Sequence, residues 1–276
     1  MGLHIPFHGN VQHEANYTGR PATTWGTQVT GSATPHTLGS KAQLIASTAF
    51  DAYWVVVTIH STSTVATNTN ALVNIYRGAS SAEQLLIPNL LAGWVQVPTS
   101  AFACRAFEFP LRVPRGTRLS ADIQGIQASK TARVMIDLYG GGDSEWAGQK
   151  VECLGAVTGS SRGTLLTPGT TSEGSFVNLG ASVSDFKYLL GMVQGTDTDT
   201  TSTNTTVALD AGVGGSVLTD LENLNVFNIN TSEMSFPLAS SRGRFCRIPA
   251  GTTVQGRLQA LGAVTEPIDA AVYGVA

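Results

Sequence analysis

Three histidines near the N-terminus, His4, His8 and His13, are the residues whose type and spacing first suggest chemistry, because imidazole is a common metal ligand. Spacings of four and five residues would suit one side of a helix, but Pro6 and Gly9 interrupt any helix there. Apart from one glutamate, no carboxylate or cysteine accompanies them. The segment therefore predicts a polar arm rather than a metal site, and we expect no cofactor.

The acidic residues form no recognisable calcium-binding or catalytic pattern. Asp197 and Asp199 resemble the start of a calcium loop, but the glycine and glutamate that complete such a loop are missing. No Gly-x-Ser-x-Gly elbow stands at a strand-to-helix turn, and no glycine-rich loop with a lysine could cradle a phosphate. A chance pair of facing carboxylates for sugar hydrolysis stays open. We expect that the protein is not an enzyme.

The three cysteines, Cys104, Cys153 and Cys246, have no CxxC spacing, which argues against a zinc knuckle or a redox motif. They could be separate, partly buried thiols. Alternatively, one of them could cross-link neighbouring subunits in an oxidising medium.

The surface predicted from the composition is polar without being ionic. Charged residues make up 13% of the chain, about half the usual share, and the net charge is −3. Neither a basic footprint for nucleic acid nor a polybasic membrane patch is present. The first residues lack the pattern of a signal peptide, and the longest apolar run, about Tyr53–Ile59, is too short to span a membrane. We therefore expect synthesis in the cytoplasm without export, and no nucleic-acid or membrane partner.

Several landmarks recur in the same order in the two halves of the chain. The segment Arg112–Thr117, with its Val-Pro-Arg-Gly-Thr turn, matches Arg247–Thr252, with Ile-Pro-Ala-Gly-Thr. Both halves close on an apolar run that ends in Tyr-Gly, at Tyr139-Gly140 and Tyr273-Gly274. An ordered series of different landmarks indicates an internal duplication.

Each copy has the pattern of a β domain. Short runs such as Ala71–Tyr76, Arg118–Gln124 and Ala132–Leu138 are typical of strands, and the last two alternate apolar and polar residues as half-buried strands do. The cysteine pair around a tryptophan that marks immunoglobulin domains is missing. The sequence therefore predicts an all-β protein with two tandem β-sandwich domains, jelly-roll-like, and an N-terminal extended arm. The predicted bounds are 1–24 for the arm, 25–140 for copy one, 141–161 for a linker and 162–276 for copy two.

A few residues are candidates for contacts between subunits. Arg112 and Arg247 are retained in both copies of a charge-poor chain, which suits either a bond within each domain or a subunit contact. Trp94 could be an exposed anchor for a partner or a sugar. Phe7 and Tyr17 lie in the arm, which could pair with a neighbouring subunit or be a loose terminus.

The paired blocks resemble those of virion structural proteins of tailed bacteriophages. The similarity lies in Ser161–Gly169, in Thr67–Leu72 with its counterpart Thr203–Leu209, and in Ile248–Thr252. What it implies is a particle component, either a head decoration or cement protein, a neck or collar protein, or a tail accessory. The implied partners are other copies of the chain and virion proteins such as the major capsid or neck and tail proteins. The alternative is a fibre module that binds a receptor or a host surface glycan.

Overall fold

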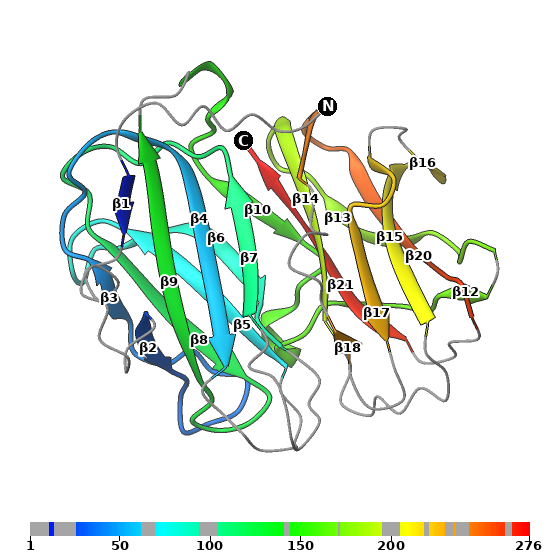
Figure 1. The fold of residues 1–276 in the computed structure, drawn as a ribbon, viewed down its shortest axis with the longest axis horizontal. Coiled ribbons are helices and arrows are strands. Elements are labelled where there is room, and N and C mark those ends of the chain that lie inside the picture. The colour runs from blue at the N-terminus through cyan, green and yellow to red at the C-terminus, as the bar shows by residue number, and fades with distance from the viewer. Residues whose placement is uncertain are drawn as a thin grey trace.

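The computed structural model describes residues 11–13, 26–61, 70–93, 104–140, 144–170, 172–194, 205–217, 221–229, 234–235, 243–262 and 267–276. Regular structure in these ranges is β, apart from two short 3₁₀ helices, η1 (Ser144–Trp146) and η2 (Thr158–Ser160). The strands form four sheets, which pack as two sandwiches side by side (Figure 1).

The first sandwich consists of sheets 1 and 2. Sheet 1 has the order β2 (Thr27–Thr30), β9 (Thr131–Gly140), β4 (Ala52–Ser61) and β7 (Cys104–Phe109), and β1 (Val11–His13) also pairs with β9. Sheet 2 has the order β3 (Ala42–Ile45), β8 (Leu119–Gly125), β5 (Ala71–Arg77) and β6 (Gln84–Leu91). All these pairings are antiparallel.

The second sandwich consists of sheets 3 and 4. Sheet 3 has the order β11 (Thr164–Leu166), β21 (Ile268–Val275), β14 (Phe186–Gln194) and β19 (Arg244–Ile248), and β10 (Val151–Leu154) also pairs with β21. Sheet 4 has the order β13 (Val177–Ala181), β20 (Thr253–Ala260), β15 (Thr205–Val213) and β17 (Asn225–Ile229). Three two-residue strands extend sheet 4, namely β12 (Gly169–Thr170), β16 (Ser216–Val217) and β18 (Met234–Ser235).

Both sandwiches are jelly rolls with the same topology. If the eight main strands of either half are counted in chain order, one sheet has the order 1-8-3-6 and the other has the order 2-7-4-5. The predicted all-β fold with two β-sandwich domains is thereby confirmed. The shared strand order also agrees with the internal duplication that the sequence predicts.

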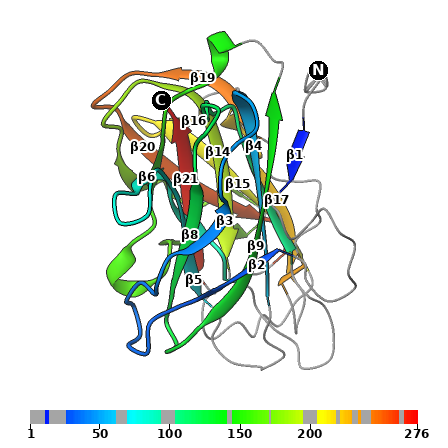
Figure 2. The same cartoon turned by 90° about the vertical axis from the view of Figure 1, so that its left-hand side faces the viewer.

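Two segments outside the predicted copies contribute strands. The predicted linker, 141–161, contains β10, which pairs with β21 over Val151–Leu154. The predicted arm, 1–24, contains β1, which pairs with β9 of its own chain (Figure 2). β1 and β10 thus occupy the same position in sheets 1 and 3.

The turn that the two copies share is built by the same side chains in each. The hydroxyl of Thr48 donates to Pro114 O (2.6 Å) and accepts the N–H of Thr117 (2.9 Å). Ser182 makes the equivalent bonds to Pro249 O (2.8 Å) and Thr252 N (3.2 Å). These hydrogen bonds satisfy the polar groups of the Pro-x-Gly-Thr turn, which is why its sequence is the best preserved part of the duplication.

A carboxylate completes each of these turns. Asp51 accepts the N–H of Arg115 (2.9 Å), and Asp185 accepts the N–H of Ala250 (2.7 Å). The sequence comparison did not single out these acids, although each stands three residues after the hydroxyl residue of its turn, Thr48 or Ser182.

Alternation of polar and apolar residues corresponds to one buried face in one strand and to two buried faces in another. In β9 it corresponds to half-buried and buried positions, as predicted. In β8 the prediction of a half-buried strand is wrong, because its polar residues Ser120, Asp122 and Gln124 are buried as well. Gln124 donates to Thr158 O (2.7 Å) in η2, and Asp122 accepts a hydrogen bond from Asn74 (2.9 Å). The segment around η2 thus contacts the outer face of sheet 2.

Candidate functional site: the junction between the sandwiches

The most elaborate arrangement of side chains among the described residues lies where the two sandwiches meet. Sheet 3 packs one face against sheet 4 and places the other face against β6 and β7, the open edge of the first sandwich. Its residues on that second face belong to the same apolar cluster as the first core, and they are Tyr188, Leu190, Met192, Ala271, Tyr273 and Val275. The core of the first sandwich therefore continues onto the outer face of sheet 3, while the interior between sheets 3 and 4 forms a second cluster.

Tyr273 is the central residue of this contact. Its ring lies edge-on to the rings of Phe107 and Phe109, with centroid distances of 5.8 and 6.2 Å. Its hydroxyl accepts the N–H of Leu91 (2.8 Å) and donates to Asn89 O (3.0 Å). Because β6 is an edge strand, these backbone groups have no neighbouring strand, and the hydroxyl replaces it. Burial raises the pKa of Tyr273 well above its usual value, so the hydroxyl stays protonated and able to donate.

Arg105 joins the two sandwiches through its guanidinium group. The side chain is buried, and Nη1 donates to Leu91 O in the first sandwich (3.0 Å) and to Val193 O in the second (2.8 Å). Burial lowers the pKa of Arg105 to about 9, which still leaves the group charged at neutral pH. A charged donor held between two carbonyl oxygens makes strong, directional bonds across the junction.

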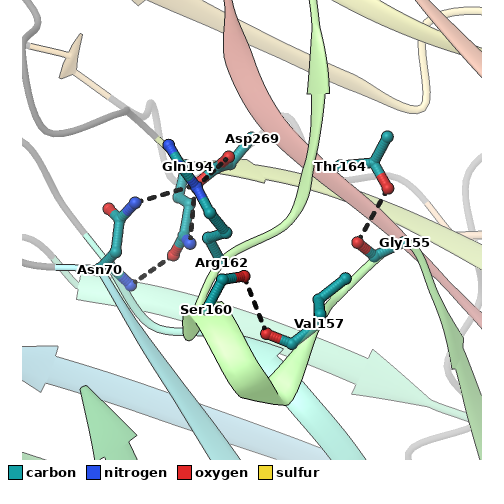
Figure 3. Close-up of polar contacts among 9 residues, drawn as sticks. Asn70, Gly155, Val157, Ser160, Arg162, Thr164, Gln194 and Asp269 are labelled. Atoms are coloured by element: carbon teal, nitrogen blue, oxygen red, sulfur yellow. Dashed lines mark hydrogen bonds and ion pairs between the residues drawn. The ribbon is translucent and has the colours of Figure 1, made fainter. Parts of the chain in front are cut away.

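A carboxylate, Asp269, occupies the adjoining part of the junction (Figure 3). It is fully buried and accepts hydrogen bonds from Asn70 of the first sandwich (2.8 Å) and from Gln194 (3.3 Å). Arg162 approaches its other oxygen at 3.5 Å. Gln194 in turn accepts the N–H of Gly93 (2.8 Å). The buried charge is thus held by donors from both sandwiches, which makes the relative position of the sandwiches specific.

A serine and a histidine also meet across the junction, with Ser161 Oγ 3.1 Å from His36 Nδ1. A hydrogen-bonded serine–histidine pair is one requirement for nucleophilic catalysis. Ser161 is fully buried, however, so its hydroxyl is closed to a substrate. This pair is accordingly a structural contact between the two sandwiches.

A row of four aromatic side chains runs along the outside of the junction. Trp54 is edge-on to Tyr188 (6.1 Å), Tyr188 to Phe245 (5.4 Å), and Phe245 to Trp146 (5.5 Å). The first two rings are partly or fully buried, whereas Phe245 and Trp146 are 41% and 49% exposed. An apolar surface of this kind in an otherwise polar protein is a candidate binding surface.

The predicted contact residues fall in different places. Arg112 and Arg247 are both exposed and stand just before the equivalent turns. Arg112 lies beside the junction, because its backbone N–H donates to Gly148 O (2.9 Å). Trp94, Phe7 and Tyr17 lie outside the described residues.

The cysteines differ in their surroundings. Cys153 is in the junction, with Sγ 3.8 Å from Asn89 O, and burial raises the pKa of its thiol to about 12. A buried thiol of this kind is poorly suited to cross-linking subunits. Cys246 is half-buried and packs against the second core, and the side chain of Cys104 lies outside the described part of the chain. A cross-link through either of these two stays a prediction.

Sequence reasoning missed Arg105, Asp269, Tyr273 and Gln194 as junction residues. Two signals were available for them. Both β14 and β21 are apolar almost without alternation, which is the pattern of a strand buried on both faces. In addition, Asp269 interrupts an apolar run and implies a buried partner, although the sequence does not say which.

The described residues offer other features, none of which combines as many converging groups. A shallow groove of about 640 Å³ lies at the β2–β3 edge and is lined mainly by small and polar residues, among them Thr30, Ser32, Gly39 and Lys41. No cluster of three or more potential metal ligands occurs within the described ranges. No helix in these ranges is long and apolar enough to cross a membrane.

Comparisons with known proteins find structural likenesses only. No family model matches the chain, and no curated protein matches it. A structure of Sulfolobus Turreted Icosahedral Virus has 11% identity and a TM-score of 0.39, over 97% of this chain and 90% of that one. The tandem CBM22-1–CBM22-2 domain of Paenibacillus barcinonensis Xyn10C has 11% identity and a TM-score of 0.28, over 96% and 90%. The N-glycanase PNGase F has 9% identity and a TM-score of 0.33, over 97% and 96%. Likenesses this distant carry no argument about function.

Proposed function

We propose that this chain is a structural component of a bacteriophage particle, made in the host cytoplasm and assembled on the capsid, neck or tail as a homo-oligomer. The observation that carries the proposal is the junction, which fuses two jelly rolls into one block through a shared core and buried polar bonds. Such a block presents two similar sets of surfaces at a set spacing. That geometry suits repeated, equivalent contacts in an assembly.

The composition of the surface supports the same proposal. A chain with 13% charged residues has few ionic groups to desolvate when neighbours cover it. The phage resemblance of the paired sequence blocks adds the type of particle. Its partners would be further copies of itself and other virion proteins, such as the major capsid protein or neck and tail proteins.

Quantitative mass spectrometry of purified phage particles tests this function. The genome that encodes the chain should yield particles containing it in many copies, in a constant ratio to the major capsid protein. Particles that lack the protein while infected cells contain it would overturn the proposal.

A second candidate function is the binding of a host surface glycan. It is favoured by the exposed rings of Trp146 and Phe245, because aromatic faces stack on sugars. A glycan array tests it with the wild type and with Trp146→Ala, which removes the most exposed ring of the row. Loss of a signal in the variant would support glycan binding, and an array without any wild-type signal would exclude it for the sugars present.

A further inference from the structure

The duplication leaves each sandwich with the same two surfaces, and the chain uses only one of each internally. The face of sheet 3 covers the β6–β7 edge of the first sandwich. The equivalent face on the first sandwich is that of sheet 1, and the equivalent edge on the second is formed by β17 and β19. Among the described strands, neither β17 nor β19 packs extensively against sheet 1.

The strand register shows which residues of the two faces correspond. Tyr139 pairs with Trp54 in sheet 1, as Tyr273 pairs with Leu190 in sheet 3. One step along, Val56 corresponds to Met192, because they pair with Asp137 and Ala271. The central tyrosine of the internal contact therefore has a counterpart on the face of sheet 1.

The outer face of sheet 1 has some of the apolar side chains that the equivalent face of sheet 3 uses for packing. Trp54, Val56, Met135 and Tyr139 are half-buried rather than exposed, and they form an aromatic and aliphatic strip that Asp137, the cross-strand partner of Val56, interrupts. Trp54 at one end of the strip also contacts Tyr188 of the second sandwich. Single apolar residues on a surface are ordinary, but a strip across two paired strands is typical of a contact surface. Sheet 1 thus has a surface suited to covering an edge of the β6–β7 kind.

The β17–β19 edge has the features of a surface that receives such a face. β19 is the outermost strand of sheet 3, and Phe245 on it is 41% exposed. β18 pairs with only Asn228 and Ile229 of β17. The exposed Arg247, retained from Arg112 at the internal junction, stands near the end of β19. Edge strands and exposed rings of this kind promote association with another chain.

We propose that a second copy of this chain places the face of its sheet 1 on the β17–β19 edge, and so repeats between molecules the contact that joins the two sandwiches within one. This deepens the proposed function and rests on its homo-oligomer. The contact is heterologous, because a face on one molecule meets an edge on the next. Repetition therefore gives a closed ring or an open filament rather than a two-fold dimer.

Two substitutions in the full-length chain interrupt the contact from opposite sides. Val56→Lys puts a charge on the face, and Phe245→Lys puts one on the edge. Each should weaken self-association about tenfold or more, because a long, strongly hydrated side chain would have to lose its water inside the contact. Val183→Lys and Leu261→Lys are matched controls, since these residues are 78% and 74% exposed and lie on neither surface. Far-UV circular dichroism and melting temperatures check that all four variants fold.

Sedimentation velocity over a range of concentrations distinguishes the outcomes. We expect multi-chain species for the wild type and both controls, and monomers for Val56→Lys and for Phe245→Lys alone. An equimolar mixture of the two variants should form 1:1 dimers and nothing larger, because one intact face and one intact edge remain.

Two results would overturn the head-to-tail contact. One is a wild type that stays monomeric up to its solubility limit, and the other is an oligomer that neither lysine disrupts. Neither would remove the protein from purified particles, so the mass spectrometry experiment still decides the proposed function separately.

Discussion

Sheets 1 and 3 have equivalent strands in the same order, yet sheet 1 has one buried face and sheet 3 has two. In β9 the residues alternate between buried and half-buried, whereas every residue of β21 is buried. The reason is the first sandwich, whose β6–β7 edge lies on sheet 3. The comparison shows that one sheet can become a surface or a core layer, depending on whether a neighbouring domain covers it.

The largest expected difference between the sheets concerns Tyr273 and Tyr139, which stand at equivalent positions in the two sheets. Tyr273→Ala should cost about 3–5 kcal/mol in the free energy of unfolding, because it empties a fully buried site and removes two hydrogen bonds. Tyr139→Ala, at a half-buried position, should cost less than half as much. Urea denaturation measures both, and equal costs would contradict the assignment of Tyr273 as the central residue of the junction.

The same pair of variants can show whether the junction couples the two domains. All four tryptophans lie before residue 147, and two of them contact rings of the second sandwich, so their fluorescence reports on the first sandwich and the junction, whereas far-UV circular dichroism reports on both sandwiches. In the wild type the two transitions should coincide, because the core is shared. Tyr273→Ala should separate them, and Tyr139→Ala should not.

Asp269 and Met135 also stand at equivalent positions in the two sheets, one with a polar side chain and the other with an apolar one. Asp269→Ala should cost about 2 kcal/mol, since Asn70 and Gln194 lose an acceptor inside the protein. The cost is moderated because Arg162 reaches solvent. Met135→Ala should cost about 1 kcal/mol or less at a half-buried site. Thermal unfolding of both variants measures the two costs. A larger cost for Met135→Ala than for Asp269→Ala would argue against a stabilising role for the carboxylate.

Alkaline pH should weaken the junction. Burial raises the pKa values of Cys153, to about 12, and of Tyr188 and Tyr273, so the folded state retains protons that the unfolded chain releases. Stability from these groups is complete below about pH 9, the usual range of a thiol, and falls as pH rises toward 12. Cys153→Ala should reduce the loss by roughly 1–2 kcal/mol at pH 11. Denaturation curves at pH 8 and pH 11 that shift equally for wild type and variant would refute this.

The smallest effect, and an equal one in both halves, is expected at the shared turns. Thr48→Ala and Ser182→Ala each remove a hydroxyl that bonds two backbone groups, which should cost about 1 kcal/mol. Both costs, measured by urea denaturation, should be alike because the turns have the same construction. A marked inequality would indicate that the duplicated turn has taken on different roles in the two copies.

The sequence predicted the all-β class, the two copies and several strands, because these depend on local patterns. The predicted run Ala71–Tyr76 is β5, and Ala132–Leu138 lies within β9. The sequence did not predict the strands β1 and β10, since both are short and lack a strong strand pattern. Of the junction groups, Cys153 was named for another reason and Arg105 was not named at all.

The sequence by itself determined the repeated scaffold, because a strand's alternation and a turn's Pro-x-Gly-Thr pattern are set by residues close together in the chain. Only the tertiary structure decided which sheet face is buried and which residues meet there. Tyr273 and Leu91, or Arg105 and Val193, are far apart in sequence, and their bonds exist only once both sandwiches have folded and packed. Burial on a second face is a property of a neighbour, and a strand's own residues do not identify that neighbour.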